Sequence, residues 1–219
     1  MHWNVPIVWV EYRKGKKWAV VDHATASRNG EPFEAVITDR NFLPNPVARI
    51  CTVEMKVLTM ERYVTQDLGW NHFTNLIGLR ADEPRRVAKI AQSGRAAFDR
   101  EAPLAQAGID IKTVSTFWNG NDFDLHLANV NGKAMKGNCD LCFLKGAWQI
   151  LSLIRETPTM AIWWMRQEAR IHSAGQINGN AGLFRSDRPS YASMYRMATQ
   201  HGELFPFDDE PLQDCMCTD

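Results

Sequence analysis

Apolar residues recur every three or four positions between Thr52 and Leu68, which is the period of one face of an α-helix. The recurring positions are Val53, Val57, Met60, Val64 and Leu68. Gly69 follows directly and is typical of a residue that ends a helix. The pattern therefore predicts an amphipathic helix over Thr52–Leu68, with Cys51 at its N-terminus.

Cys51 stands where the backbone N–H groups of that helix have no intrahelical partner. These groups and the helix dipole favour a thiolate over a thiol, so Cys51 is a candidate reactive or metal-binding residue. The alternative is a small hydrophobic residue packed beneath the first helical turn.

The hydrophobic pattern elsewhere predicts both strands and helices. Pro6–Glu11 contains a continuous apolar run, which is typical of a strand buried on both faces in a parallel sheet. Further strands are predicted at Trp18–Val21 and Phe73–Gly78. Helices are predicted at Pro32–Ile37, from Pro84, at Ile111–Trp118 after the capping residue Asp110, at Leu144–Ile154, at Thr159–His172 and at Ser190–Ala198. The order of elements indicates an α/β core followed by a helical C-terminal region that packs on it.

Composition adds few constraints to this picture. The 219 residues are 45% hydrophobic, which suits one well-packed domain with a small appendage. Lysine plus arginine and aspartate plus glutamate are both 25, so no overall field attracts nucleic acid, and nucleic-acid binding is left open. The chain has no apolar run long enough to cross a bilayer and no secretion signal at its start, so a cytoplasmic protein without a membrane partner is expected.

Cysteines form the clearest chemical pattern in the chain. Cys139 and Cys142 are separated by two residues, so a tight turn can bring both thiolates to a single zinc or iron. Cys51, Cys215 and Cys217 are the other three cysteines, and an odd total without a secretion signal favours metal or reactive thiols over disulfides. The alternatives are a redox pair at residues 139 and 142 and a disordered tail around the last two cysteines.

A second pattern indicates anion binding. The predicted strand Phe73–Gly78 leads into a loop with Arg80, Arg85 and Arg86, and a helix is predicted to start at about Pro84. Loops at the carboxyl ends of strands and helix N-termini both bind anions, and guanidinium groups match phosphate or sulfate oxygens. The alternative is a local salt bridge from Arg80 or Arg85 to Asp82 or Glu83.

Catalytic residues are not identified by any pattern. None of the six histidines has a partner at metal-ligand spacing, and no Ser-His-Asp arrangement or carboxylate pair stands out.

With these residues placed, the chain resembles the phosphoadenosine phosphosulfate (PAPS) reductase-like branch of the adenine nucleotide alpha-hydrolase (PP-loop) superfamily, particularly its small phage-encoded versions. Cys51–Lys56 is similar to the family's vicinal-cysteine motif, with Thr52 in place of the second cysteine and Met55 in place of an arginine. Gly78-Leu79-Arg80 is similar to the family's Gly-x-Arg segment. Cys139 and Cys142 follow in the family's order.

The resemblance implies a truncated PP-loop-type parallel sheet with helices over residues 1–142, followed by the helical C-terminal region over residues 143–219 with its cysteine-containing tail. It implies a [4Fe–4S] cluster held by Cys51, Cys139 and Cys142, with Cys215 or Cys217 as the fourth ligand; zinc is the alternative. It also implies that Lys56, Arg80, Arg85 and Arg86 bind a sulfonucleotide or another ligand with a phosphate or sulfate group.

One departure from the family bears on activity. The Ser-Gly-Gly-x-x-Ser loop that cradles phosphate in the family is absent, and Pro6–Glu11 is similar to the family's second strand. A second copy or a partner chain is one source of that loop. The chain is therefore expected to be an iron–sulfur protein of sulfonucleotide reduction or sulfur transfer, with two alternatives: a non-catalytic binding protein whose fold is held by iron–sulfur or zinc, or a component of nucleobase or tRNA sulfur modification.

Overall fold

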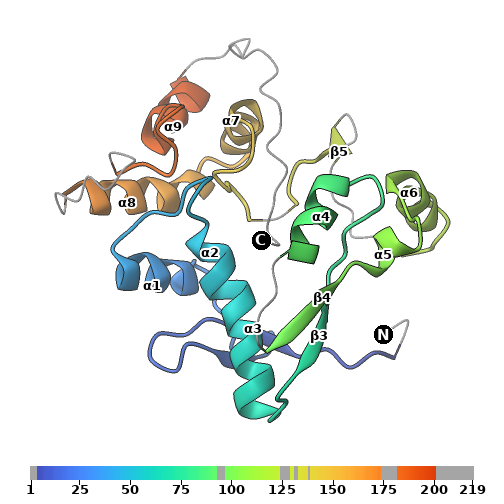
Figure 1. Cartoon of the computed structure of the whole chain (residues 1–219). Coiled ribbons are helices and arrows are strands. Elements are labelled where there is room, and N and C mark those ends of the chain that lie inside the picture. The colour runs from blue at the N-terminus through green and yellow to red at the C-terminus, as the bar shows by residue number, and fades with distance from the viewer. Residues whose placement is uncertain are drawn as a thin grey trace. The chain divides into compact units, whose positions relative to one another are not determined.

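The computed structural model describes residues 4–92, 97–123, 129–130, 133–137, 139–173 and 182–200 (Figure 1). The chain divides into two compact units. The first unit contains the described residues up to Thr59 and those from residue 129 onward, and the second contains those from Met60 to Phe123. The predicted boundary between residues 142 and 143 falls within the first unit.

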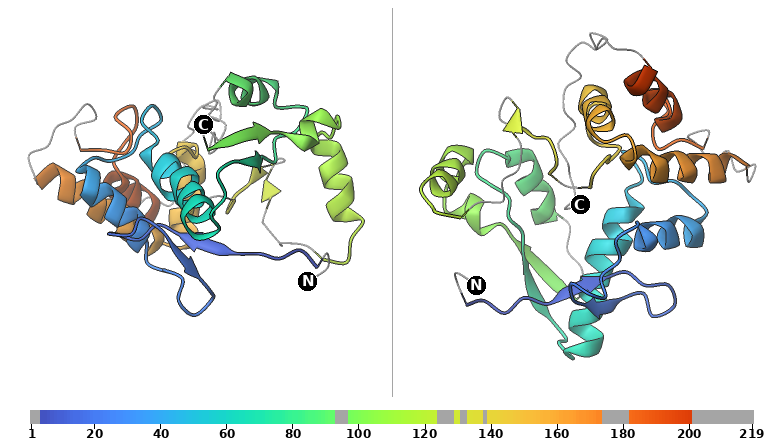
Figure 2. Two further views of the ribbon diagram at one scale, coloured as in Figure 1. Left: turned by 60° about the horizontal axis from the view of Figure 1, so that its bottom comes forward. Right: turned by 180° about the vertical axis from the view of Figure 1, so that it is seen from behind.

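Helices make up most of the first unit (Figure 2). Its N-terminal part holds a hairpin and the start of a long helix, namely β1 (Trp9–Glu11), β2 (Ala19–Val21), α1 (Glu31–Arg40), α2 (Ile50–Thr52) and η1 (Val53–Val57). Its C-terminal part holds a short antiparallel pair and three helices, namely β5 (Asn129–Val130), β6 (Lys133–Ala134), α7 (Ala147–Glu156), α8 (Met160–Ser173) and α9 (Tyr191–Gln200). The two parts are far apart in the sequence but share one core.

That shared core is built from aromatic and aliphatic side chains. Trp164 of α8 lies 4.9 Å from Phe184 and 5.1 Å from Tyr191 between ring centroids, and Phe33 of α1 lies 5.9 Å from Trp164. Each large apolar side chain buried in this way stabilises the fold by about 1.5–3 kcal/mol. The C-terminal helices are therefore integral to the packing around α1.

The second unit contains a small parallel sheet. Its elements are α3 (Leu58–Arg62), which begins at the unit boundary, η2 (Tyr63–Asp67), β3 (Phe73–Leu76), α4 (Pro84–Gln92), β4 (Phe98–Glu101), α5 (Pro103–Gln106) and α6 (Ile111–Asn119). Strands β3 and β4 pair in parallel, with the rings of Phe73 and Phe98 stacked at 5.0 Å, and α4 connects them. With one parallel pair and many helices, the protein is a mixed α/β protein at this coarse level.

The predicted buried strand at Pro6–Glu11 is wrong. Only Trp9–Glu11 is a strand, it pairs antiparallel with β2, and Ile7 and Trp9 are 59% and 68% exposed. An apolar run indicates an extended backbone, but it does not indicate which element covers it. The core takes Tyr12 and Trp18 from the two ends of the connecting loop instead.

The predicted helix at Thr52–Leu68 is confirmed in position, since residues 50–67 are helical and Gly69 follows with a φ of 70°. Its predicted buried face is only partly right, because Val53 and Leu68 are exposed whereas Thr52, Glu54 and Thr59 are buried. Two π-helical stretches change the number of residues per turn, so a 3.6-residue period does not predict the face. Glu54 is held by an ion pair with Arg40, and the Thr59 hydroxyl donates to the Glu54 carbonyl at 2.8 Å.

The other predicted helices are confirmed with shifted ends. Asp110 caps α6 as expected, because its carboxylate accepts the Thr113 N–H at 2.8 Å. Strand β4 was not predicted, since Asp99, Arg100 and Glu101 leave only Phe98 as an apolar signal. Its strand conformation depends on pairing with β3.

Candidate functional site

The Cys-x-x-Cys segment forms a turn in the first unit. The Cys142 N–H donates to the Cys139 carbonyl at 3.4 Å. Cys139 is exposed, whereas Cys142 is 8% exposed and belongs to the hydrophobic core with its neighbours Leu141 and Phe143. The turn therefore exposes one cysteine and buries the other.

Two helices hold this turn from within. The Asp140 carboxylate accepts the Leu141 N–H at 2.9 Å and the Trp164 indole N–H at 3.3 Å. The Tyr191 hydroxyl donates to the Leu141 carbonyl at 2.5 Å. Because Trp164 is on α8 and Tyr191 opens α9, the turn is tied to both helices.

Buried polar side chains hold the backbone on either side of the turn. Lys145 donates through Nζ to the Gly137 carbonyl at 2.5 Å, and Gln149 donates to the Met135 carbonyl at 3.0 Å. Arg188 in turn donates to the Lys145 carbonyl at 2.7 Å. A buried hydrogen bond of this kind contributes about 0.5–1.5 kcal/mol, and breaking one leaves a costly unsatisfied carbonyl.

Burial changes the proton affinity of two groups in this support. Burial raises the pKa of Tyr191 well above its ordinary value, although the nearby Arg188 guanidinium opposes the change. Its hydroxyl therefore keeps the proton that it donates to Leu141. Burial also raises the pKa of Glu168, whose carboxylate accepts the N–H groups of Phe184 and Tyr191 at 3.3 and 2.9 Å.

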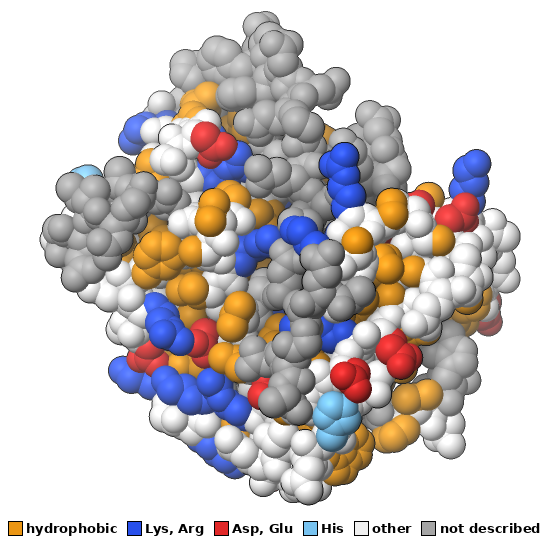
Figure 3. Space-filling view, in the orientation of Figure 1, with side chains coloured by type: hydrophobic (Ala, Val, Ile, Leu, Met, Phe, Trp, Pro, Cys, Tyr) orange, Lys and Arg blue, Asp and Glu red, His pale blue; other side chains and the backbone are white. Residues whose placement is uncertain are grey.

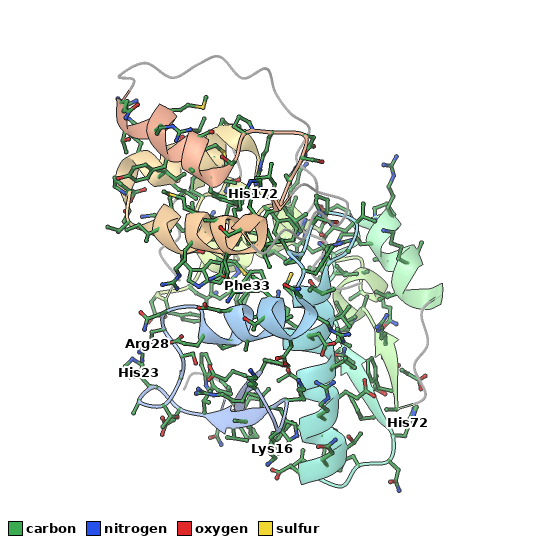
Figure 4. All side chains as sticks on the ribbon, turned by 90° about the vertical axis from the view of Figure 1, so that its left-hand side faces the viewer. Lys16, His23, Arg28, Phe33, His72 and His172 are labelled. Carbon is green, nitrogen blue, oxygen red and sulfur yellow. The ribbon has the colours of Figure 1, made fainter. Side chains whose placement is uncertain are left out.

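A pocket of about 570 Å³ opens beside the turn in the same unit. We call it the α1–α8 pocket, and it is lined by Arg28, Asn29, Gly30, Phe33, Met55, Cys139, Asp140, Thr159, Met160, Ile162, Trp163, Trp164 and Arg166. Figure 4 shows Phe33 between α1 and α8 and Arg28 on the loop that precedes α1. Cys139, the exposed cysteine of the turn, is therefore part of the pocket wall.

The wall of this pocket is aromatic and its cations are arginines. Trp163 lies 5.1 Å from both Phe33 and Trp164 between ring centroids. Arg28 is exposed and donates to the His23 carbonyl, and Arg166 is 59% exposed with its nearest carboxylate, Glu34, at 3.5 Å. In Figure 3, hydrophobic and basic side chains lie next to each other over α1 and α8, on the left. Such a surface suits a planar ring that carries negative charge.

Gly30 permits the close packing at one side of the pocket. Its φ is 83°, and a Cβ there would lie 2.7 Å from Trp163 Nε1. Any other residue would both strain the backbone and displace the indole. The orientation of Trp163 therefore depends on a glycine immediately before α1.

The predicted metal ligands are only partly described. Cys51 is half-buried and packs against the core cluster that contains Cys142, and Met55, one turn later, lines the α1–α8 pocket with Cys139. Within the described ranges, no three His, Cys, Asp or Glu residues gather as a metal site. Cys215 and Cys217 lie outside the described residues. Thiolates suit iron–sulfur or zinc chemistry, and the four-cysteine centre stays a prediction.

The predicted anion-binding arginines are in the second unit, whereas the exposed Lys56 is in the first. Arg80 binds Asp82 through two hydrogen bonds of 2.9 and 3.2 Å, and Arg86 pairs with Glu83. This is the local salt bridge that the sequence offered as the alternative for Arg80. The Arg80 guanidinium lowers the pKa of Asp82 through these bonds. Arg85 is exposed, and binding of an anion here stays a prediction.

Sequence patterns did not identify Arg28, Trp163 and Arg166 as site residues. Two signals were present: Arg28-Asn29-Gly30 directly precedes a helix with proline in its first turn, and Trp163-Trp164 follows a Thr-Pro-Thr helix start. Each signal is common in helix packing, so only their convergence on one pocket makes them notable.

In the part of the chain that the structure describes, no helix has the length and apolar character needed to cross a membrane. Comparison with known proteins yields no matching family model, no matching curated protein and no matching solved structure.

Proposed function

We propose that the protein binds a sulfonucleotide, or a related ligand with an aromatic ring and a phosphate or sulfate group, in the α1–α8 pocket. We further propose that Cys139 serves sulfur chemistry on that ligand as a ligand of a metal centre beside the pocket. The observation that carries the proposal is the pocket itself, because Cys139, two arginines and two tryptophans line the same cavity.

The dimensions and chemistry of the pocket support this ligand class. Its volume of about 570 Å³ falls within the range of about 300–1,000 Å³ that is usual for small-molecule sites. Indole faces stack on bases, and guanidinium groups bind phosphate or sulfate oxygens in pairs. Arg28 and Arg166 supply such groups, and Trp163 supplies an indole.

A metal centre is a separate part of the proposal. Cys51, Cys139, Cys142 and one of Cys215 and Cys217 would hold it, and an iron–sulfur cluster would supply electrons, or zinc a Lewis acid, next to the pocket. Ligand binding as proposed needs only the described residues. At the level of fold, the parallel β3–α4–β4 unit supports a truncated PP-loop-type sheet, since parallel strands joined by a helix are its building block.

One observation favours a second candidate function, a non-catalytic binding protein that is stapled by metal. Cys142 lies in the core, and buried hydrogen bonds from Tyr191, Lys145 and Gln149 hold the turn around it. A metal at that turn would stabilise the fold directly.

Binding of ADP, measured by isothermal titration calorimetry with adenosine as the uncharged comparison, tests the leading proposal. We expect ADP to bind more tightly than adenosine, and Arg166→Ala to weaken ADP binding at least tenfold, since a hydrogen bond to a charged group contributes about 1.5–3 kcal/mol. Arg196→Ala, an exposed arginine on α9, is the matched control and should have no effect.

The role of Cys139 is tested separately. Cys139→Ser should keep ADP binding, because serine preserves the shape of the pocket wall, and should lose any turnover of a sulfonucleotide. Equal ADP affinity in the wild type and Arg166→Ala would refute the pocket assignment. Turnover by Cys139→Ser at the wild-type rate would support the non-catalytic role of this thiol.

A further inference from the structure

The last described helix is followed by a segment whose residue types are complementary to those of the α1–α8 pocket. Residues 205–210 read Phe-Pro-Phe-Asp-Asp-Glu, so two phenylalanines stand directly before three acidic residues. These residues lie outside the described ranges.

The pocket has the complementary chemistry. Its aromatic wall includes Trp163 and Phe33, and Ile162 beside them is 55% exposed although it is a large apolar residue. Arg28 and Arg166 provide positive charge at the same pocket. An apolar surface bordered by cations is complementary to a segment of aromatic residues followed by carboxylates. Contact with such a segment is more favourable for this surface than contact with water.

The chain is long enough for this contact. Helix α9 begins at Tyr191, whose ring stacks on the pocket residue Trp164 at 5.1 Å, and it continues for ten residues, or about 15 Å. Phe207 lies seven residues after Gln200, which allows an extended chain to span about 23 Å. The segment can therefore return along α9 to the pocket within one molecule.

We propose that Phe205–Glu210 docks in the α1–α8 pocket of its own chain. The phenylalanine rings cover Ile162 and Trp163, and the carboxylates face Arg28 and Arg166. A ligand with an aromatic ring and negative charge then competes with the protein's own C-terminal segment. The contact acts as an internal competitor, and it does not depend on whether the ligand is a sulfonucleotide.

The expected strength follows from the short connection. A segment joined by a short linker has an effective concentration of about 1 mM at its site, so one with an intrinsic dissociation constant of about 0.1 mM weakens a competing ligand about tenfold. Cys215 lies five positions after Glu210, so it stays within about 17 Å of the docked segment. The contact would thereby bring the C-terminal thiols to the side of the protein that carries Cys139.

Titration of the full chain with 8-anilinonaphthalene-1-sulfonate, an aromatic anion whose fluorescence rises on binding, tests the proposal. We expect the double variant Phe205→Ser/Phe207→Ser to bind this probe about tenfold more tightly than the wild type, because the internal competitor is lost. Leu212→Ser changes a hydrophobic residue of the same segment outside the docking sequence, and it should bind like the wild type. Adding Arg166→Glu to the double variant should weaken binding of the probe again, and this loss would locate the bound probe in the pocket.

Equal probe affinity in the wild type and the double variant would overturn the docking proposal, and so would an equal gain in Leu212→Ser. A gain in the double variant that persists after Arg166→Glu would also overturn it, because the probe would then bind elsewhere.

Binding of ADP separates this proposal from the proposed function. If the double variant gains affinity for the probe but does not bind ADP, docking is supported and the sulfonucleotide proposal fails. If ADP binds the wild type and the double variant equally, docking fails and the sulfonucleotide proposal stands.

Discussion

The two units differ in their buried polar side chains, which among the described residues all lie in the first unit. In the first unit, buried side chains such as Lys145, Gln149 and Arg188 donate to backbone carbonyls around the Cys-x-x-Cys turn. Charge pairs near the surface occur in both units, as in Arg80 with Asp82 in the second and Lys17 with Asp39 in the first. Buried hydrogen bonds fix a backbone in one conformation, whereas exposed ion pairs contribute little to stability.

The arginines of the two units also differ in what surrounds them. The arginines of the second unit occur close together in the sequence, and this clustering predicted an anion-binding site. Two of them form ion pairs with neighbouring carboxylates. Arg28 and Arg166, which are separated by most of the chain, line one pocket of the first unit. Proximity in the sequence is therefore a poor guide to which cations line a pocket.

The largest expected effect comes from the core that supports the turn. Trp164→Ala should lower the free energy of unfolding by about 3–5 kcal/mol, because it removes a buried aromatic side chain and the partner of Asp140. Urea denaturation followed by circular dichroism measures the change. Phe117→Ala, at a residue of the second unit that is 47% exposed, should cost far less. Equal losses in the two variants would show that the units do not differ in this way.

A smaller effect is expected from two glycines with similar backbone geometry. Gly30 and Gly108 have φ values of 83° and 69°, but a Cβ at Gly30 would lie 2.7 Å from Trp163 Nε1, whereas a Cβ at Gly108 would have no neighbouring atom within 4 Å. Gly108→Ala should cost about 1–2 kcal/mol for the left-handed backbone alone. Gly30→Ala should cost about 1–3 kcal/mol more, because it also overpacks the pocket wall. Thermal unfolding of both variants gives the comparison, and equal costs would mean that the indole moves freely.

The smallest expected effect is on the pH dependence of stability, and it has opposite signs for two carboxyl groups, one in each unit. Burial raises the pKa of Glu168, so its ionisation opposes folding, and stability falls as the pH rises from about 4.5 through the folded-state pKa. The pKa of Asp82 is lowered by Arg80, so stability falls as the pH drops through and below 3.8.

Unfolding curves of the wild type, Glu168→Gln and Asp82→Asn between pH 3 and pH 8, a rough range chosen to bracket both carboxyl groups, test these signs. The stability of the wild type relative to Glu168→Gln should fall with rising pH, whereas its stability relative to Asp82→Asn should rise. The same slope for both pairs would contradict the difference in burial between the two carboxylates.

Local patterns predicted much of the secondary structure. The capping aspartate before α6, the proline near the start of α1 and the glycine after residues 50–67 are confirmed, because each acts on backbone within a few residues. The exposed hairpin strand at Trp9–Glu11 and the polar strand β4 were missed or misjudged, because their environments depend on distant partners. The Cys-x-x-Cys turn was identified as a chemical feature, but its support from Trp164 and Tyr191 was not.

By itself, the sequence determined the positions of most helices and the presence of two thiols in one tight turn, since helix periodicity, capping and a two-residue spacing are local properties. Only the tertiary structure decided that Cys139 faces a pocket while Cys142 is buried, and that Arg28, Trp163 and Arg166 line the same cavity. The reason is physical: burial and the meeting of side chains depend on how helices pack across long sequence separations, and the core that joins α1 to α8 also brings these residues together.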